Sequence, residues 1–217
     1  MTVIRQDDLI DSVADALQFI SYYHPVDFVQ AVHQAYEREQ NPAARDAMAQ
    51  ILINSRMCAL GHRPICQDTG IVTVFLKVGM NVTWEATMSV TDMVNEGVRR
   101  AYTHPDNVLR ASILEDPAGA RKNTRDNTPA VIHYEIVDGD TVDVQVAAKG
   151  GGSENKSKLV MLNPSDSIVD WVVKTVPTMG AGWCPPGMLG IGIGGTAEKA
   201  AVLAKESLMD PIDIHEL

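Results

Sequence analysis

Ile71-Val-Thr-Val-Phe-Leu-Lys-Val-Gly79 is the segment that decides the fold class of this chain. Its β-branched and aromatic residues stand between two glycines, which predicts a buried β-strand. The residues before position 61 differ in character, because their apolar side chains recur at helical spacing. The expected fold is therefore mixed α/β, with a helical N-terminal region followed by a small mixed sheet packed with helices.

Three further segments have the character of strands. The runs 130–137 and 141–148 flank Asp138-Gly139-Asp140, which predicts two strands joined as a β-hairpin. Leu189, Ile191 and Ile193 alternate with glycines, and this pattern predicts a strand whose glycine face allows close packing.

Helices are expected both before and after the predicted strand at 71–79 in the sequence. The first has an apolar face formed by Leu9, Ile10, Val13, Leu17 and Ile20. A second follows Pro25, and a third begins with Asn41 as N-cap and ends at Gly61. The later helices are expected to start at Thr91, after Ser165-Asp166, and at Thr196, and residues 104–129 read as a long polar loop.

Composition excludes several classes of function. The 217 residues include 18 Lys+Arg and 28 Asp+Glu, a net charge of −10, so no nucleic-acid partner is expected. No membrane association is expected either, because no apolar run approaches the roughly 20 residues of a membrane helix. Three cysteines with no CxxC pair do not form a disulfide framework and suit a reducing, cytoplasmic location.

The three cysteines receive different interpretations. Cys58 lies seven residues after Ile51 on one helical face, so we interpret it as a core residue. Cys66 lies in a turn before the strand, where the residue types allow a ligand, a nucleophile or an ordinary loop cysteine. Cys184 precedes two prolines, a setting that suits an iron–sulfur ligand or a packed thiol.

Two glycine-rich segments are candidates for anion binding. The run 149–156 combines three glycines with polar donors, which is compatible with an anion cradle or with a flexible turn. The run 190–195 matches GxGxxG in spacing, but Cys184-Pro-Pro-Gly187 occupies the place where a dinucleotide site needs a strand. We therefore expect no dinucleotide site there. A nucleotide- or phosphate-binding protein stays a weaker alternative.

Several motifs occur in an order that resembles one enzyme family. They are Ile65-Cys-Gln-Asp-Thr-Gly70, Asn127-Thr-Pro-Ala130, Lys149-Gly-Gly-Gly-Ser-Glu-Asn155, Cys184-Pro-Pro186 and Ile193-Gly-Gly-Thr196. Together they resemble the N-terminal part of class I fumarate hydratases and the alpha subunit of the related tartrate dehydratases. The resemblance covers about residues 45–210, and the ordered set is more specific than any single motif.

The resemblance implies an oxygen-sensitive hydro-lyase with a four-iron four-sulfur cluster, an enzyme type of the tricarboxylic acid cycle. Cys66 and Cys184 match two of the cluster ligands. Gln67, Asp68, Arg110 and Gly151 match positions that contact a small dicarboxylate substrate, Gly151 through the backbone. Asp68 also matches an acidic residue in proton transfer near the departing hydroxyl.

The resemblance also implies what these 217 residues lack. The family's third cluster cysteine lies beyond the Ile193–Thr196 motif, and the chain stops at Leu217 without it. We expect residues 1–217 to be the alpha-type N-terminal domain, with a helical subregion at 1–60 and a cluster-binding α/β subregion at 61–217.

Partners and turnover follow from the same expectation. A C-terminal domain or beta subunit would complete the site, and the family suggests a homodimer. The expected reaction is hydration of fumarate to L-malate, and the isolated chain is expected to be inactive. The alternatives are a tartrate dehydratase alpha subunit and a non-catalytic binding or assembly module.

Overall fold

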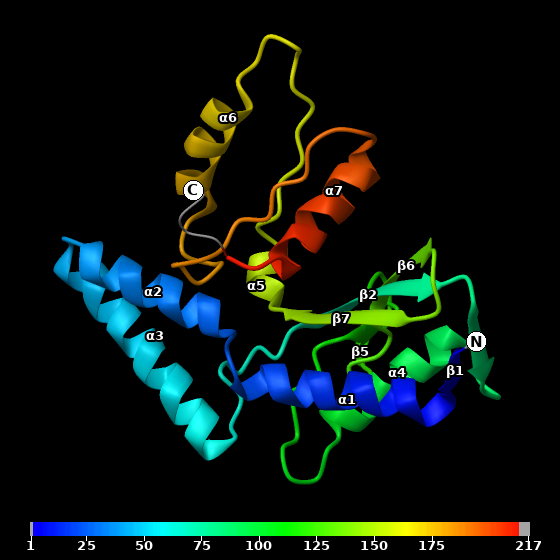
Figure 1. Cartoon of the computed structure of the whole chain (residues 1–217). Helices are drawn as coiled ribbons and strands as arrows, with labels where there is room; N and C mark the ends of the chain where they lie inside the picture. The colour runs from blue at the N-terminus through cyan, green and yellow to red at the C-terminus, as the bar shows by residue number, and fades with distance from the viewer. Residues whose placement is uncertain (1, 213–217) are drawn as a thin grey trace. The chain divides into compact units, whose positions relative to one another are not determined.

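A computed structural model describes residues 2–212, so the chain end at Leu217 lies outside the described part. Two compact units divide the chain: residues 2–149 together with Ile212, and Gly150–Pro211. Helices and small sheets both occur, which confirms the mixed α/β prediction (Figure 1). None of the described helices is long and apolar enough to cross a membrane.

The main sheet of the first unit has three strands with the predicted segment at its centre. Strand β2 (Ile71–Gly79) lies between β6 (Val131–Val137) and β7 (Val142–Lys149). It pairs parallel to β6, with Val74 opposite Ile132, and antiparallel to β7, with Val74 opposite Val146. The strand prediction for 71–79 is confirmed.

The predicted hairpin between the second and third of these strands is wrong, although both strands exist. β2 separates β6 from β7, so Asp138-Gly139-Asp140 passes over the end of β2. Gly79 N–H donates to Thr141 O at 2.9 Å, and Asn81 N–H donates to Gly139 O at 2.9 Å. A Cβ on Gly79 would lie 2.6 Å from Gly139 O, so this crossing requires glycine.

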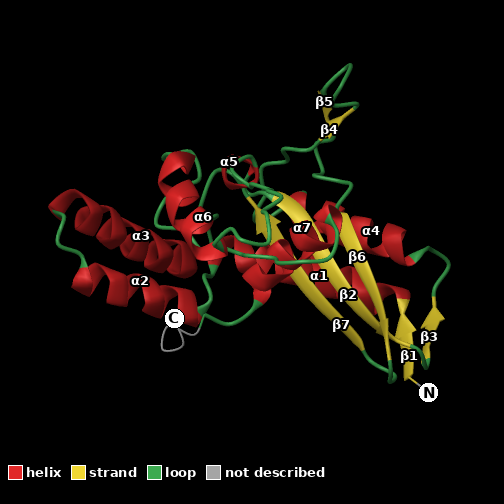
Figure 2. Cartoon of the chain, turned by 90° about the horizontal axis from the view of Figure 1, so that it is seen from above, coloured by secondary structure: helices red, strands yellow, loops and turns green. Residues whose placement is uncertain are grey.

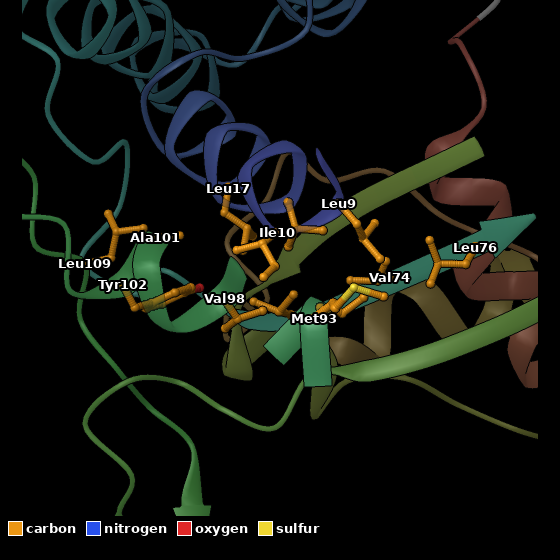
Figure 3. Close-up of a cluster of buried hydrophobic side chains, with 13 residues drawn as sticks. Leu9, Ile10, Leu17, Val74, Leu76, Met93, Val98, Ala101, Tyr102 and Leu109 are labelled. Atoms are coloured by element: carbon orange, nitrogen blue, oxygen red, sulfur yellow. The ribbon is translucent and has the colours of Figure 1, made fainter. Parts of the chain in front are cut away.

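Two helices cover one face of this sheet and form the core with it. Helix α1 (Gln6–Tyr22) packs against α4 (Val90–Tyr102), and both lie against β2 (Figures 2 and 3). A second, two-stranded parallel sheet joins β1 (Thr2–Arg5) to β3 (Val82–Glu85). The central cluster of buried residues in this unit consists of Leu9, Ile10, Val13, Leu17, Val72, Val74, Leu76, Met93, Val94, Val98, Ala101, Tyr102 and Leu109.

The N-cap of helix α4 lies two residues earlier than predicted. Ser89 is the N-cap, and its Oγ accepts a hydrogen bond from Asp92 N–H at 3.1 Å. The hydroxyl of Thr91 instead shares a hydrogen bond of 2.8 Å with the hydroxyl of Tyr134 on β6. Both residues are good N-caps, so local preference alone does not choose between them.

Helices α2 (Val26–Arg38) and α3 (Pro42–Gly61) follow α1. Asn41 caps α3 as predicted, because its Oδ1 accepts from Ala43 N–H at 2.9 Å. Cys58 is 7% exposed and forms weak hydrogen bonds with Asn54 Oδ1 and Pro64 O. The interpretation of Cys58 as a core residue is confirmed.

The predicted loop at 104–129 holds one small feature of regular structure. Strands β4 (Leu114–Glu115) and β5 (Lys122–Asn123) form an exposed two-residue ladder. The carboxylate of Asp116 organises the turn between them by accepting from Ala120 N–H at 2.9 Å. The rest of the segment has no helix or strand.

The second unit has helices and no strand between residues 150 and 211. It contains α5 (Gly151–Glu154), α6 (Ile168–Thr175), the 3₁₀ turns η1 (Val176–Met179) and η2 (Ser207–Met209), and α7 (Ala197–Glu206). Ser167 caps α6 and Thr196 is the N-cap position of α7, close to the predicted helix starts.

The strand predicted at 189–195 is wrong, but its glycines pack as expected. The segment has no strand pairing, and its glycines lie against α7. A Cβ on Gly190 would collide with Ala204 O, and one on Gly192 would collide with Ala200 O. The alternating glycines therefore permit contact with a helix backbone rather than with a neighbouring strand.

Gly192→Ala is expected to destabilise the second unit by about 1–3 kcal/mol, because the new methyl group meets helix backbone that cannot move aside. Limited proteolysis with mass spectrometry should show faster cleavage within residues 150–211. Gly61→Ala is the matched control, since its Cβ would meet nothing closer than 3.8 Å. Equal protease resistance of the two variants would contradict the packing argument.

Candidate functional site

The segment that carries Cys66 is anchored through both backbone groups of the preceding residue, Ile65. After α3, His62 takes a left-handed conformation with φ 47° and turns the chain back. Ile65 N–H then donates to Ser21 O at 2.8 Å, and Ile65 O accepts from Asn54 Nδ2 at 2.9 Å. The residue before Cys66 is thus fixed to α1 and to α3.

Three predicted site residues follow in a row at this position. Cys66 is an exposed free cysteine, and its thiol donates to Gln67 Oε1 at 3.2 Å. The carboxylate of Asp68 accepts from Gly70 N–H at 3.3 Å, which closes a tight turn before β2. Gly70 has φ +88°, and a Cβ there would lie 2.6 Å from the Ala148 carbonyl carbon, so only glycine fits.

The segment with Arg110 lies beside this turn. The hydroxyl of Thr69 donates to Arg110 O at 2.6 Å, and Leu109 N–H donates to Tyr102 O at 3.2 Å. Tyr102 also donates from its hydroxyl to Thr69 O at 2.7 Å. The structure therefore brings Asp68 and its neighbours together with the backbone of Arg110.

Tyr102, in the last turn of α4, is not among the residues that the sequence motifs mark. It is 1% exposed, and burial raises the pKa of its hydroxyl to about 12, with the nearby Asp68 carboxylate acting in the same direction. The hydroxyl is therefore neutral and a hydrogen-bond donor throughout the physiological pH range. Its place in the last turn of α4 is the only sequence signal that marks it.

Arg110, which lies in the loop after α4, differs from the two arginines of that helix. Arg99 pairs with Asp126 at 3.0 Å, and Arg100 pairs with Glu96 at 3.1 Å. The guanidinium of Arg110 is exposed and forms no ion pair with any carboxylate of residues 2–212. It can therefore form bidentate hydrogen bonds with a carboxylate without first breaking an ion pair within the protein.

The second unit carries the other two predicted site residues. Gly151 is the first residue of the four-residue helix α5, and Cys184 lies in a turn closed by its N–H to Ala181 O at 3.0 Å. A Cβ on Gly152 would lie 2.5 Å from Gly182 O. The glycine-rich turn and the cysteine loop are therefore packed together within this unit.

Cys184 is exposed and has φ 59°, a backbone conformation that costs a non-glycine residue about 1–2 kcal/mol. The glycine-rich run uses one donor of the expected anion cradle within its own turn. Its Ser153 hydroxyl donates to Gly150 O at 3.1 Å, and Glu154 pairs with Lys205 at 2.7 Å. These contacts weaken the nucleotide-binding alternative.

The donor chemistry of the chain fits part of an iron–sulfur site. Two of its three thiols are exposed in turns, where thiolates can reach iron, and the third is buried with its own partners. Within residues 2–212 no group of three or more His, Cys, Asp or Glu side chains is placed to hold a metal ion. Cys66 in the first unit and Cys184 in the second are thus the two exposed thiols of the chain, and their role as cluster ligands stays a prediction.

Comparison with known proteins adds an independent line of evidence. A family model described as fumarate hydratase (Fumerase) matches residues 10–217. A protein of Methanocaldococcus jannaschii described as putative L(+)-tartrate dehydratase subunit alpha is 34% identical over 209 residues, which cover 93% of this chain and 72% of that protein. The L(+)-tartrate dehydratase subunit alpha of Escherichia coli strain K12 is 28% identical over 207 residues, covering 94% and 68% respectively.

Proposed function

Because this chain belongs to the fumarate hydratase (Fumerase) family, we propose that residues 1–217 form the alpha-type N-terminal domain of an iron–sulfur hydro-lyase. The proposed reaction is the reversible addition of water to fumarate, which gives L-malate. The observation that carries this proposal is the fixed turn of Cys66, Gln67 and Asp68, hydrogen-bonded through Thr69 to Arg110.

Each side chain has a role that its chemistry supports. The Arg110 guanidinium binds one substrate carboxylate, and the Gln67 amide donates to substrate oxygen. Asp68 exchanges a proton with the water or hydroxyl that is added or expelled. The lack of a side chain at Gly151 lets a substrate approach the backbone closely.

We assign the cluster ligands from this chain to Cys66 and Cys184, with a third cysteine ligand from outside these residues. A cluster bound there would supply a Lewis acid that stabilises hydroxide as it leaves or is added. Arg110 and Gln67 would hold the dicarboxylate, so the protein would supply orientation and charge balance.

A tartrate dehydratase alpha subunit is the second candidate, because the relatives named above carry that description. Their names as alpha subunits support a beta-type subunit, or an equivalent C-terminal domain, as the partner. A homodimer and a cytoplasmic location, where thiols stay reduced, complete the proposal. If no complex turns over either dicarboxylate, the chain would instead be a non-catalytic binding or assembly module.

Anaerobic iron–sulfur reconstitution followed by two parallel assays tests this proposal. The chain with its beta-type partner is expected to hydrate fumarate, and the chain alone is expected to be inactive. L(+)-tartrate dehydration, measured on the same preparation, decides between the two substrates. Iron binding without turnover of either dicarboxylate by the complex would contradict the hydro-lyase assignment.

A further inference from the structure

Asn127 is a polar residue that the proposed mechanism does not use, yet its side chain is completely buried. Its exposed fraction is 0%, and Thr73 at 1% is the other polar residue of the described chain with this degree of burial. Resting on the proposed function, we propose that Asn127 is a positioning residue. It holds the Cys66–Gly70 turn and the Arg110–Ser112 segment in one fixed arrangement.

The hydrogen bonds of Asn127 connect these two segments directly. Its Nδ2 donates to Gly70 O at 3.0 Å, and its Oδ1 accepts from Ser112 N–H at 2.7 Å. Gly70 lies two residues after Asp68, and Ser112 lies two residues after Arg110. One side chain thus ties together the backbones on which an acid–base group and a carboxylate-binding group stand.

The amide group suits this task better than other side chains. An amide donates and accepts at the same time, whereas an ionised carboxylate only accepts. The backbone of Asn127 is also left-handed, with φ 62°, a conformation that asparagine tolerates better than most residues. Residue type and backbone conformation therefore agree with the two hydrogen bonds.

Thr73 shows that burial of a polar residue does not by itself hold neighbouring segments in place. Thr73 lies within β2, and its Oγ1 has no hydrogen-bond partner in the structure, so it is packed like an apolar residue. Both partners of Asn127 lie instead in segments without regular structure. Such segments have no strand ladder to hold them, so side-chain hydrogen bonds must order them. Asn127 supplies two of these bonds, beside the bonds of Thr69 and Tyr102 described above.

Asn127→Gly tests the proposal, because glycine keeps access to the left-handed backbone and removes both side-chain hydrogen bonds. Hydrogen exchange of the chain, read by mass spectrometry, is expected to accelerate about tenfold in peptides covering 66–70 and 110–112. Exchange within β2 is expected to stay unchanged. Asn95→Ala is the matched control, since Asn95 accepts from Ala130 N–H at 2.9 Å and bonds neither segment.

The assembled enzyme gives a second readout. Asn127→Gly is expected to raise the KM for the dicarboxylate about tenfold, because Arg110 loses its fixed position. A purely structural role would lower the active fraction and leave KM unchanged. Unchanged exchange in both segments, or acceleration that is equal in β2, overturns the proposal. The exchange result stands by itself if the enzyme proves to have another substrate.

Discussion

Cys66→Ser and Cys184→Ser, each in the assembled and reconstituted enzyme, are expected to lower fumarate hydration by about three orders of magnitude or more. Removal of a Lewis acid costs several kcal/mol of transition-state stabilisation, and each 1.36 kcal/mol is a factor of ten in rate. Iron and sulfide analysis should show that both variants lose their cluster. Both cysteines are exposed in turns, so these substitutions are expected to leave the fold intact.

Cys58→Ala is the internal control for these two variants. Its thiol is buried and bonded to Asn54 and Pro64, so the expected effect is a loss of about 1 kcal/mol of stability. Iron content and turnover should stay close to those of the wild type. Loss of the cluster in this variant, with retention in either of the other two, would reverse the ligand assignment.

Asp68→Asn is expected to lower kcat by about 10²–10⁴, the range that general acid–base catalysis contributes. The Gly70 N–H that bonds Asp68 Oδ1 can bond the amide oxygen equally well, so the turn should keep its shape. Iron content should be unchanged, which separates this variant from the cysteine variants. Steady-state kinetics with fumarate and with L-malate measures the effect in both directions.

Asp143→Asn removes the same charge from an exposed position on β7 and serves as the control. Its kcat is expected to match that of the wild type. A kcat for Asp68→Asn within a factor of two of this control would remove Asp68 from the proton-transfer step. A raised KM with unchanged kcat would leave it only a substrate-binding role.

The sequence predicts those parts of the fold that depend on local preference. The strand at 71–79, the Asn41 cap and the helical face of Cys58 follow from residue type and spacing, and the structure confirms each. The cluster and substrate roles of Cys66, Cys184 and the residues near them come from family resemblance. Those roles stay predictions.

The two wrong strand interpretations share a physical cause. Asp138-Gly139-Asp140 is good hairpin chemistry, but it does not specify whether a third strand enters between the two that it joins. The alternation at 189–195 shows that one face must be free of side chains, and not whether a strand or helix α7 lies against it. Contacts between segments that are distant in the sequence decide both cases, and a short window of sequence does not contain them.

The position of β2 between two later strands has a consequence for the order of folding. Thr73 pairs with Val131, and Ile71 pairs with Lys149, so neither ladder can close until a long stretch of chain has been made. Closing such large loops costs entropy before any contact repays it, which slows folding. On the ribosome, Cys66 and β2 would therefore emerge long before β6 and β7. The Cys66 thiol would already be exposed while the sheet is still unformed.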